Sequence, residues 1–212
     1  MVQRSLFYQS PWIYRAGLLL IHGKHLDERY KYIADQIGKG KSVLEPACGT
    51  ALLPDYLDKS CTYTGFDKNE RFVRHAQKKS LHVNVGNALD PAMYTPCDTA
   101  VFCDALHHIG LSNELSAIER ALHAASQQLI ICEPFKDRYL GLLPNWIPGS
   151  QKVLETWFDY IEKDGNNQVR LKDIRMRKEL EEIMMEGYGI IPPQVRREIN
   201  NIGEDLIVTY HL

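Results

Sequence analysis

Short apolar runs alternate with longer amphipathic stretches through the middle of the chain. The apolar runs read SVLEPA, TYTGFD, HVNVGNA, DTAVFCDAL and QLIICEP, and the stretches between them include ALLPDYL, RFVRHAQ and LSAIERALHAA. Strand followed by helix, repeated in this way, is typical of a parallel sheet with helices on both faces. The pattern therefore predicts a doubly wound α/β core over residues 41–134.

Two further segments flank this core. After Pro11, apolar residues recur at helical spacing up to Gly38 and Gly40, so residues 1–40 are expected to be a helical cap segment. Residues 192–212 read as a hairpin, with strands at Val195–Ile199 and Leu206–Tyr210. A terminal hairpin adds an antiparallel strand to an otherwise parallel sheet.

Residues 135–191 form an insertion between the core and the hairpin. Its first part, FKDRYLGLLPNWIPGSQKVLETWFDYIEKDGNN, is rich in aromatic residues and broken by prolines, and a helix is expected from about Lys172 to Met185. Aromatic residues taken singly are more often core than pocket. A long insertion of this composition is equally consistent with the wall or lid of a binding site.

Length and composition fit one globular domain spanning residues 1–212. Of the 212 residues, 44% are hydrophobic and 25% are charged, which is an ordinary globular composition. The chain carries 25 Lys and Arg against 27 Asp and Glu, and the sequence pI is about 6.4. This near balance produces no strong field toward polyanions, so we expect no nucleic-acid partner.

The cysteines and the apolar N-terminal run bear on the compartment. Five cysteines, an odd number without zinc-like spacing, predict reduced thiols and no metal site. The run Ala16–Ile21 is far shorter than the roughly 20 residues that span a bilayer, and no signal-peptide cleavage pattern follows it. We therefore expect a cytoplasmic protein without stable membrane insertion, and the sequence makes no prediction of oligomeric state.

Small residues follow an acid at the end of the first predicted strand. The strand ends in Glu45 and is followed by Ala47, Cys48, Gly49 and Thr50, with a helix expected next. Small residues let a ligand approach the backbone, and amides that open a helix attract an anion. Ligands of doubly wound sheets bind outside the carboxyl ends of the strands, which makes this loop a candidate site. As alternatives, Glu45 caps the next helix, and Cys48 is a packing residue rather than a nucleophile.

Polar residues follow the next three strands as well. Asp67 ends the second strand, the third runs into Asn87, and the fourth ends in Asp104. A carboxylate at the second position can accept both hydroxyls of a ribose, and an Asn can pair with the edge of a purine. Asp67 as a helix cap and Asn87 as a turn residue are the alternatives. His107 and His108 follow on a loop beside the same crevice.

With these residues identified, the region from Gly40 to Pro134 and the terminal hairpin resemble the class I S-adenosylmethionine-dependent methyltransferases. The resemblance implies a mostly parallel seven-stranded sheet with an antiparallel C-terminal strand, the Rossmann-like methyltransferase fold. It also implies S-adenosylmethionine as cofactor and S-adenosylhomocysteine (SAH) as product. Asp-Ala-Leu-His follows the fourth strand, instead of the Asn-Pro-Pro-Tyr run of many nucleic-acid-methylating members, so the chain resembles the small-molecule branch.

The resemblance also assigns roles to individual residues. Ala47, Gly49 and Ala51 take the places of three glycines, and a methyl group there permits most right-handed conformations but crowds a close approach. Asp67 matches the ribose-binding acid and Asn87 the adenine contact. The predicted cofactor-binding set is Glu45, Ala47, Cys48, Gly49, Thr50, Asp67, Lys68, Asn87, Ala88, Asp104 and Arg15. Tyr14 and Arg15, in the helix before the sheet, are candidates for closing the cofactor pocket, where Arg15 would neutralise the methionine carboxylate.

The reaction implied is displacement of a methyl group from a sulfonium onto an acceptor atom aligned opposite the sulfur. The protein then has mainly to exclude water and hold the reacting atoms in line. A hydroxyl acceptor would make His107 or His108 the natural base, whereas a neutral amine would need none. We expect the acceptor to be a small, partly apolar molecule that receives the methyl group on an O, N or C atom. His108 is the first candidate to touch it.

Two other classes of function stay open. A nicotinamide-dependent oxidoreductase would also carry an acid after the second strand, but its first loop should read Gly-x-Gly-x-x-Gly, and the chain has Glu-Pro-Ala-Cys-Gly-Thr-Ala. A non-catalytic relative that binds S-adenosylmethionine is the other alternative, because only the middle glycine of the first loop is present.

Overall fold

The computed structural model describes residues 5–137, 152–153, 156, 159–160 and 174–212. Seven strands in this part of the chain form one sheet in the order β3-β2-β1-β4-β5-β7-β6. The strands are β1 (Ser42–Pro46), β2 (Thr62–Asp67), β3 (His82–Val85), β4 (Cys97–Cys103), β5 (Ala125–Pro134), β6 (Arg196–Ile202) and β7 (Asp205–His211). β1 to β5 pair in parallel, and β7 runs antiparallel to both β5 and β6. The predicted doubly wound sheet with an antiparallel C-terminal strand is confirmed.

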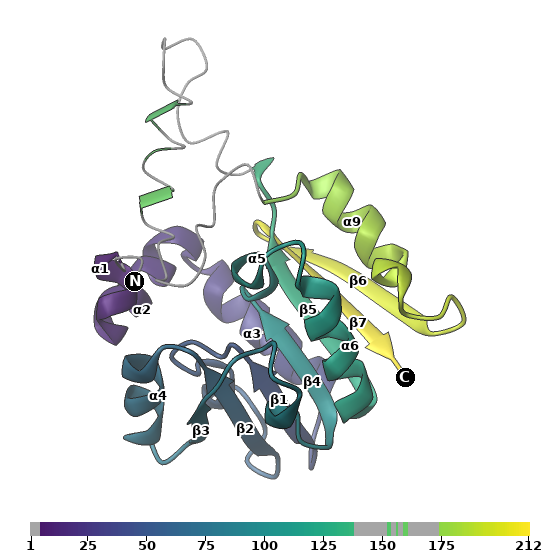
Figure 1. Ribbon diagram of the computed structural model, residues 1–212, viewed down its shortest axis with the longest axis horizontal. Coiled ribbons are helices and arrows are strands. Elements are labelled where there is room, and N and C mark those ends of the chain that lie inside the picture. The colour runs from purple at the N-terminus through teal and green to yellow at the C-terminus, as the bar shows by residue number, and fades with distance from the viewer. Residues whose placement is uncertain (1–4, 138–151, 154–155, 157–158, 161–173) are drawn as a thin grey trace.

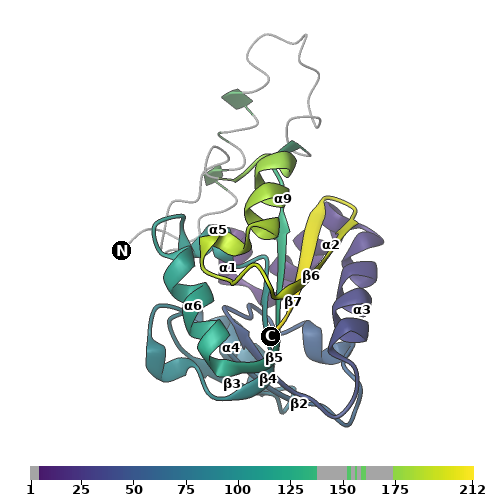
Figure 2. The same cartoon turned by 90° about the vertical axis from the view of Figure 1, so that its right-hand side faces the viewer.

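Helices cover both faces of the sheet (Figures 1 and 2). The α-helices are α1 (Leu6–Gln9), α2 (Pro11–His22), α3 (His25–Ile37), α4 (Glu70–Gln77), α5 (Leu106–Ile109), α6 (Glu114–Ala124) and α9 (Arg177–Met185), and short 3-10 helices are η1 (Leu53–Asp55), η2 (Pro91–Met93) and η4 (Gly187–Gly189). Figure 2 shows α6 and α9 on one side of the sheet and α3 on the other.

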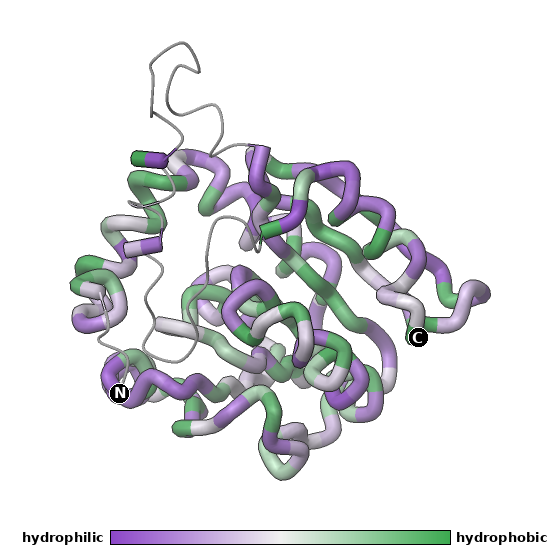
Figure 3. Tube along the Cα trace, turned by 45° about the horizontal axis from the view of Figure 1, so that its top comes forward, coloured by the Kyte–Doolittle hydropathy of each residue, from purple (hydrophilic) through white to green (hydrophobic). Residues whose placement is uncertain are grey.

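The alternation of side chains along the central strands explains the two layers. Phe102 of β4 and Ile131 of β5 pack with α6 and α9 in one buried cluster. Their sequence neighbours Val101 and Cys132 pack with α3 in a second cluster on the opposite face. Because both faces are covered, these strands read as nearly continuous apolar runs, which Figure 3 shows as hydrophobic segments at the centre of the trace.

Three details of the predicted secondary structure are wrong, namely one expected helix and the bounds of two other elements. No α-helix follows Thr50, where the structure has a loop and the one-turn η1. Gly49 and Ala51 both have left-handed φ values, of 55° and 52°, and Pro54 lacks an amide N–H, so the chain cannot continue an α-helix here. The hairpin strands extend further than expected, because the turn is confined to residues 203–204. α9 begins at Arg177 rather than near Lys172, and Lys172 itself lies outside the described residues.

Candidate functional site

The carboxyl ends of β1, β2, β3 and β4 border one cavity of about 850 Å³. Its walls come from the loops after these four strands and from the N-terminal helices. The lining residues are Tyr8, Tyr14, Ala47, Gly49, Asp67, Lys68, Asn69, Phe72, Gly86, Asn87, Ala88, Leu89, Asp104, Ala105, His108, Ile109 and Asn113. We call it the strand-end cavity. Its volume of about 850 Å³ includes the solvent at its open mouth.

The loop after β1 approaches this cavity with its backbone in an unusual conformation. Ala47, Gly49 and Ala51 have φ values of 54°, 55° and 52°. Both alanines therefore have the left-handed conformation that a glycine adopts without strain. A left-handed non-glycine residue costs roughly 1–2 kcal/mol, because Cβ crowds the following carbonyl oxygen. Packing compensates, since Ala51 is fully buried against α4 and Ala47 packs against the core below the cavity.

Asp67 connects two loops at the end of β2. One carboxylate oxygen accepts the amide of Gly49 at 2.8 Å, and the other accepts the amide of Asn69 at 2.7 Å. The residue that caps α4 is Asn69, whose side-chain oxygen accepts the amide of Arg71. A carboxylate in the lining of the cavity is an acceptor for the hydroxyls of a ligand. Asp67 is thus held in one orientation at the cavity wall.

The loops after β2 and β3 add three more of the predicted residues to the lining. Asn87 accepts the amide of Leu89 with its side-chain oxygen at 3.1 Å, the geometry of an Asx turn. This bond fixes the side chain at the cavity wall without using its amide hydrogens. Lys68 and Ala88 lie beside it in the lining.

Four predicted cofactor residues lie outside the lining of the strand-end cavity. Glu45 is 2% exposed beneath the β1 loop and accepts the hydroxyl of Tyr63. Burial raises the pKa of Glu45 from 4.5 to about 8. Cys48 and Thr50 are buried behind the same loop.

Arg15, the fourth of these residues, points to a different partner. Its guanidinium lies 3.9 Å from the carboxylate of Asp55 in η1. The neighbouring residue of α2, Tyr14, does line the cavity, and the centroid of its ring lies 4.8 Å from the centroid of the Phe72 ring. Within the described residues, α2 therefore contributes an aromatic side chain to the site rather than a cation.

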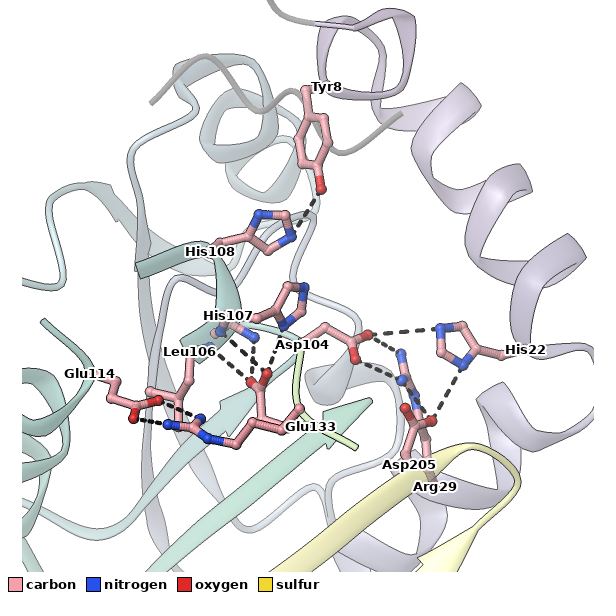
Figure 4. Close-up of polar contacts among 12 residues, drawn as sticks. Tyr8, His22, Arg29, Asp104, Leu106, His107, His108, Glu114, Glu133 and Asp205 are labelled. Carbon is pink, nitrogen blue, oxygen red and sulfur yellow. Dashed lines mark hydrogen bonds and ion pairs between the residues drawn. The ribbon is translucent and has the colours of Figure 1, made fainter. Parts of the chain in front are cut away.

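Asp104 belongs to a buried ionic cluster that the sequence did not indicate (Figure 4). Arg29 of α3 donates to both oxygens of Asp104, at 2.6 and 3.1 Å, and to Asp205 of β7 at 3.0 Å. His22 lies 3.3 Å from Asp205. Burial acts to raise the pKa of Asp104, but the charges of Arg29 and His22 outweigh it and hold this pKa at about 2.

A local signal for Arg29 does exist. Arg29 falls on the apolar face of its helix, at the spacing Leu26, Arg29, Ile33, and all three side chains are buried. A charge at such a position needs a buried partner. The partner is Asp104, which has φ of 52°, a conformation that Asp tolerates better than most residues. The cluster joins the N-terminal helices to the strand end that borders the cavity.

The two histidines after β4 have different partners. Nδ1 of His107 lies 2.6 Å from the carboxylate of Glu133, the single acidic residue of β5. Nε2 of His108 lies 3.0 Å from the hydroxyl of Tyr8 in α1. His108 lines the strand-end cavity, whereas His107 lines a smaller cavity next to it. Glu133 is therefore a further candidate residue, and it stands at a fifth strand end.

The smaller cavity lies between the N-terminal helices and the histidines, and we call it the histidine cavity. It is lined by Phe7, Tyr8, Tyr14, Leu18, Ile21, His22, Asp104, His107, His108 and Pro134. Tyr8, Tyr14, Asp104 and His108 line both cavities. The two spaces are therefore adjacent, and the wall of the second combines apolar side chains with histidines, tyrosines and an aspartate.

Among the described residues, no helix is long and apolar enough to cross a bilayer. The same residues contain no group of three or more His, Cys, Asp or Glu side chains suited to a metal ion.

No protein-family model and no curated protein sequence matches the chain. Solved structures do resemble it. The plantazolicin methyltransferase BamL, in complex with a triazolic desmethylPZN analog and SAH, superposes with a TM-score of 0.64 at 12% identity, covering 97% of this chain and 92% of that one. Magnesium protoporphyrin IX methyltransferase from Synechocystis, with bound SAH, gives a TM-score of 0.61 at 16% identity, covering 90% and 83%.

A third neighbour is an O-methyltransferase family protein from Burkholderia thailandensis, with a TM-score of 0.62 at 10% identity. The match covers 95% of this chain, which spans only 59% of that protein. Together, these similarities show that the chain has the Rossmann-like fold of S-adenosylmethionine-dependent methyltransferases.

Proposed function

We propose that the protein is an S-adenosylmethionine-dependent methyltransferase that acts on a small, partly apolar molecule. The observation that carries the proposal is the strand-end cavity, which collects the polar residues of β2, β3 and β4 around one space. The oriented carboxylate of Asp67 and the small-residue loop after β1 fit a nucleoside-containing cofactor. The solved neighbours with bound SAH share this fold.

The residues of the cavity can divide the recognition of such a cofactor between them. Asp67 accepts the ribose hydroxyls, Asn87 offers its side-chain amide to the adenine edge, and the backbone after β1 permits close approach at Gly49. The cofactor supplies an activated methyl group on a sulfonium. Tyr14 and Tyr8 close the N-terminal side of the cavity and exclude water, which favours the in-line geometry.

The acceptor belongs on the side of the histidine cavity. One solved neighbour is named for magnesium protoporphyrin IX and another for plantazolicin, and neither name is that of a nucleic acid. The side chains of Phe7, Leu18 and Ile21 form an apolar part of the lining of the histidine cavity. The chain's formal net charge of -2 is also unsuited to a polyanionic acceptor.

The proposal is tested by incubating the protein with S-adenosylmethionine labelled in the methyl group and a metabolite extract. We expect label in a small, extractable product and inhibition by added SAH. SAH binding without any labelled product would indicate the alternative, a non-catalytic binder. Label that stays with added nucleic acid would contradict the proposed acceptor class.

A further inference from the structure

The outward side of α2 is apolar along the whole helix. All of its exposed residues are apolar, namely Trp12, Ile13, Ala16, Leu19 and Leu20. Leu20 is 87% exposed and Trp12 is 73% exposed. At 3.6 residues per turn these five positions lie within about 120° of one another around the helix, so they form one stripe. Isolated exposed apolar residues are normal, but a continuous row of them marks a surface that binds another body.

The fold does not need this stripe to hold α2 in place. The opposite side of the helix is the one that packs inward, where Gly17 is buried and Tyr14 lines both cavities. The stripe also has no negative charge near it in sequence, because residues 1–26 contain no Asp or Glu and the first acid is Asp27. An apolar helix side without acids suits a body whose own surface is negatively charged.

Trp12 connects the stripe to a groove lined by positive side chains. α2 and α4 lie side by side (Figure 1), and the groove between them is lined by Trp12 together with Arg71, Arg74 and Lys78. The ring of His75 meets the ring of Trp12 edge to face, with 5.5 Å between the centroids. The apolar stripe and the positive groove therefore share one residue and form one continuous surface, which we call the α2–α4 surface.

The positive charge of this surface is a local excess. Residues 68–79 contain five lysines and arginines and one acid, Glu70, although the whole chain has a formal net charge of -2. Burial lowers the pKa of His75, and the charges of the neighbouring lysines and of Arg15 lower it further, against the opposing charge of Asp55. Cations thus dominate the electrostatic surroundings of the groove, and the balanced totals of the chain conceal this.

We infer that the α2–α4 surface docks reversibly on an anionic lipid bilayer. α2 lies in the plane of the bilayer surface, with Leu19 and Leu20 among the upper acyl chains and Trp12 at the level of the headgroups, where tryptophan is enriched. Arg71, Arg74 and Lys78 then contact lipid phosphates and carboxylates.

This occupant fits the surface better than two others. A nucleic acid would satisfy the cations but offers no apolar layer to the leucines of α2. A second copy of the chain would present the same positive groove and not a complementary charge. Only an anionic bilayer matches both parts of the surface at once. The docked protein would hold the inner side of α2, and with it the two cavities, close to the bilayer.

The first test is co-sedimentation with vesicles of phosphatidylcholine alone and of phosphatidylcholine mixed with phosphatidylserine. We expect binding to the mixed vesicles that weakens as salt is added, and much weaker binding to the neutral ones. Leu20→Gln should weaken binding to the mixed vesicles about tenfold, because this leucine leaves water on docking. Leu115→Gln, at an exposed leucine of α6, is the matched control and should bind like the unaltered protein.

A second pair of variants tests the charges. Lys78→Gln should weaken binding to the mixed vesicles about fivefold and reduce its salt dependence. Lys178→Gln, on the exposed side of α9, removes the same charge elsewhere and should have no effect. Both lysines are solvent-accessible, so neither change threatens the fold.

The orientation is tested by quenching of tryptophan fluorescence with brominated phosphatidylcholine in the mixed vesicles. We expect quenching in the unaltered protein and loss of most of it in Trp12→Phe. Full quenching in that variant would mean that another part of the chain faces the bilayer, and would overturn the assigned surface.

The remaining outcomes are equally decisive. Absence of vesicle binding, equal binding to the two kinds of vesicle, or equal effects of Leu20→Gln and Leu115→Gln would overturn the inference. So would a dimer in sedimentation velocity that Leu20→Gln dissociates, since the stripe would then belong to a second copy. Binding of inorganic phosphate or of nucleic acid without binding of vesicles would assign the groove to those ligands instead. None of these measurements uses S-adenosylmethionine, so their failure leaves the proposed function standing.

Discussion

Arg29 joins the buried carboxylate of Asp205 to the mostly buried carboxylate of Asp104, so its replacement by methionine should destabilise the fold strongly. Arg29 and Asp205 have exposed fractions of 0%, and Arg29 contacts both Asp205 and Asp104 within 3.1 Å. Methionine has a comparable apolar stem but no charge. The variant therefore leaves both carboxylates buried without their cation, a change that typically costs 3–5 kcal/mol.

The pKa of Asp104 gives an independent magnitude. Against opposing burial, the charges of Arg29 and His22 lower it from 3.8 to about 2. This shift corresponds to about 2 kcal/mol of stability from one carboxylate. Because the pKa in the folded state is depressed, the contribution is complete above pH 4 and is lost as the pH falls toward 2. Adding the cost of the second carboxylate, we expect Arg29→Met to lose about 4 kcal/mol at pH 7.

Urea unfolding of the two proteins between pH 7 and pH 5 measures this difference. In Arg29→Met, Asp104 stays buried without its main counter-charge, so its pKa should rise above the unfolded value. The folded variant then binds more protons than the unfolded chain, and its deficit should shrink as the pH falls. Arg74→Met, which removes an exposed pair with Glu70, should cost under about 0.5 kcal/mol. A deficit below 1 kcal/mol for Arg29→Met, or one independent of pH, would refute the reasoning.

Three further changes have defined outcomes. Ala47→Gly should raise the free energy of unfolding by about 1 kcal/mol, because it relieves a left-handed alanine with φ of 54°; thermal unfolding measures it. Gly17→Ala should lower the free energy of unfolding by about 1–3 kcal/mol despite the better helix propensity of alanine, because the new Cβ would lie 1.9 Å from the ring of Phe7. The affinity for SAH should fall in the same variant. Glu45→Gln should gain about 3 kcal/mol at pH 7, since burial raises the pKa of Glu45 to about 8 and the folded carboxyl must stay protonated.

Each of these predictions can be contradicted. Loss of stability in Ala47→Gly would mean that the packing of the Ala47 methyl group outweighs the backbone strain. Full stability in Gly17→Ala would mean that the fold does not depend on the contact between Gly17 and Phe7. For Glu45, the sign is checked by pH: wild-type stability should decline from pH 4.5 to pH 8, and Glu45→Gln should remove that decline. Parallel profiles for the two proteins would contradict a raised pKa.

The sheet and the position of its cavity could be predicted because they depend on local patterns. Apolar runs such as DTAVFCDAL mark buried parallel strands, and the carboxyl ends of such strands meet at one edge. Asp67, Asn87 and Asp104 each follow a strand, so their convergence on the strand-end cavity follows from chain order. The prediction of a helix after Thr50 was wrong because it used only the apolar periodicity of ALLPDYL. That periodicity carries no information on the left-handed conformations of Gly49 and Ala51 or on the helix-breaking effect of Pro54.

The partners of the buried polar groups could not be predicted in the same way. Arg29 is separated by 75 residues from Asp104 and by 176 from Asp205, and no local spacing encodes such pairs. The contact of His107 with Glu133 also depends on the pairing of β4 with β5. The sequence favoured His108 as the first candidate to touch the acceptor. In the structure it is His107 that contacts the carboxylate of Glu133, whereas His108 contacts the hydroxyl of Tyr8.

Binding at the strand-end cavity is tested most directly by calorimetric titration with S-adenosylmethionine, SAH and NAD in parallel. We expect one molecule of SAH to bind per chain, with Asp67→Ala at least tenfold weaker and Asp90→Ala, a change at the exposed cap of η2, unaffected. NAD should produce no binding heat. Binding of NAD alone, or no binding of SAH and S-adenosylmethionine to the folded protein, would contradict a methyltransferase cofactor site at the ends of these strands.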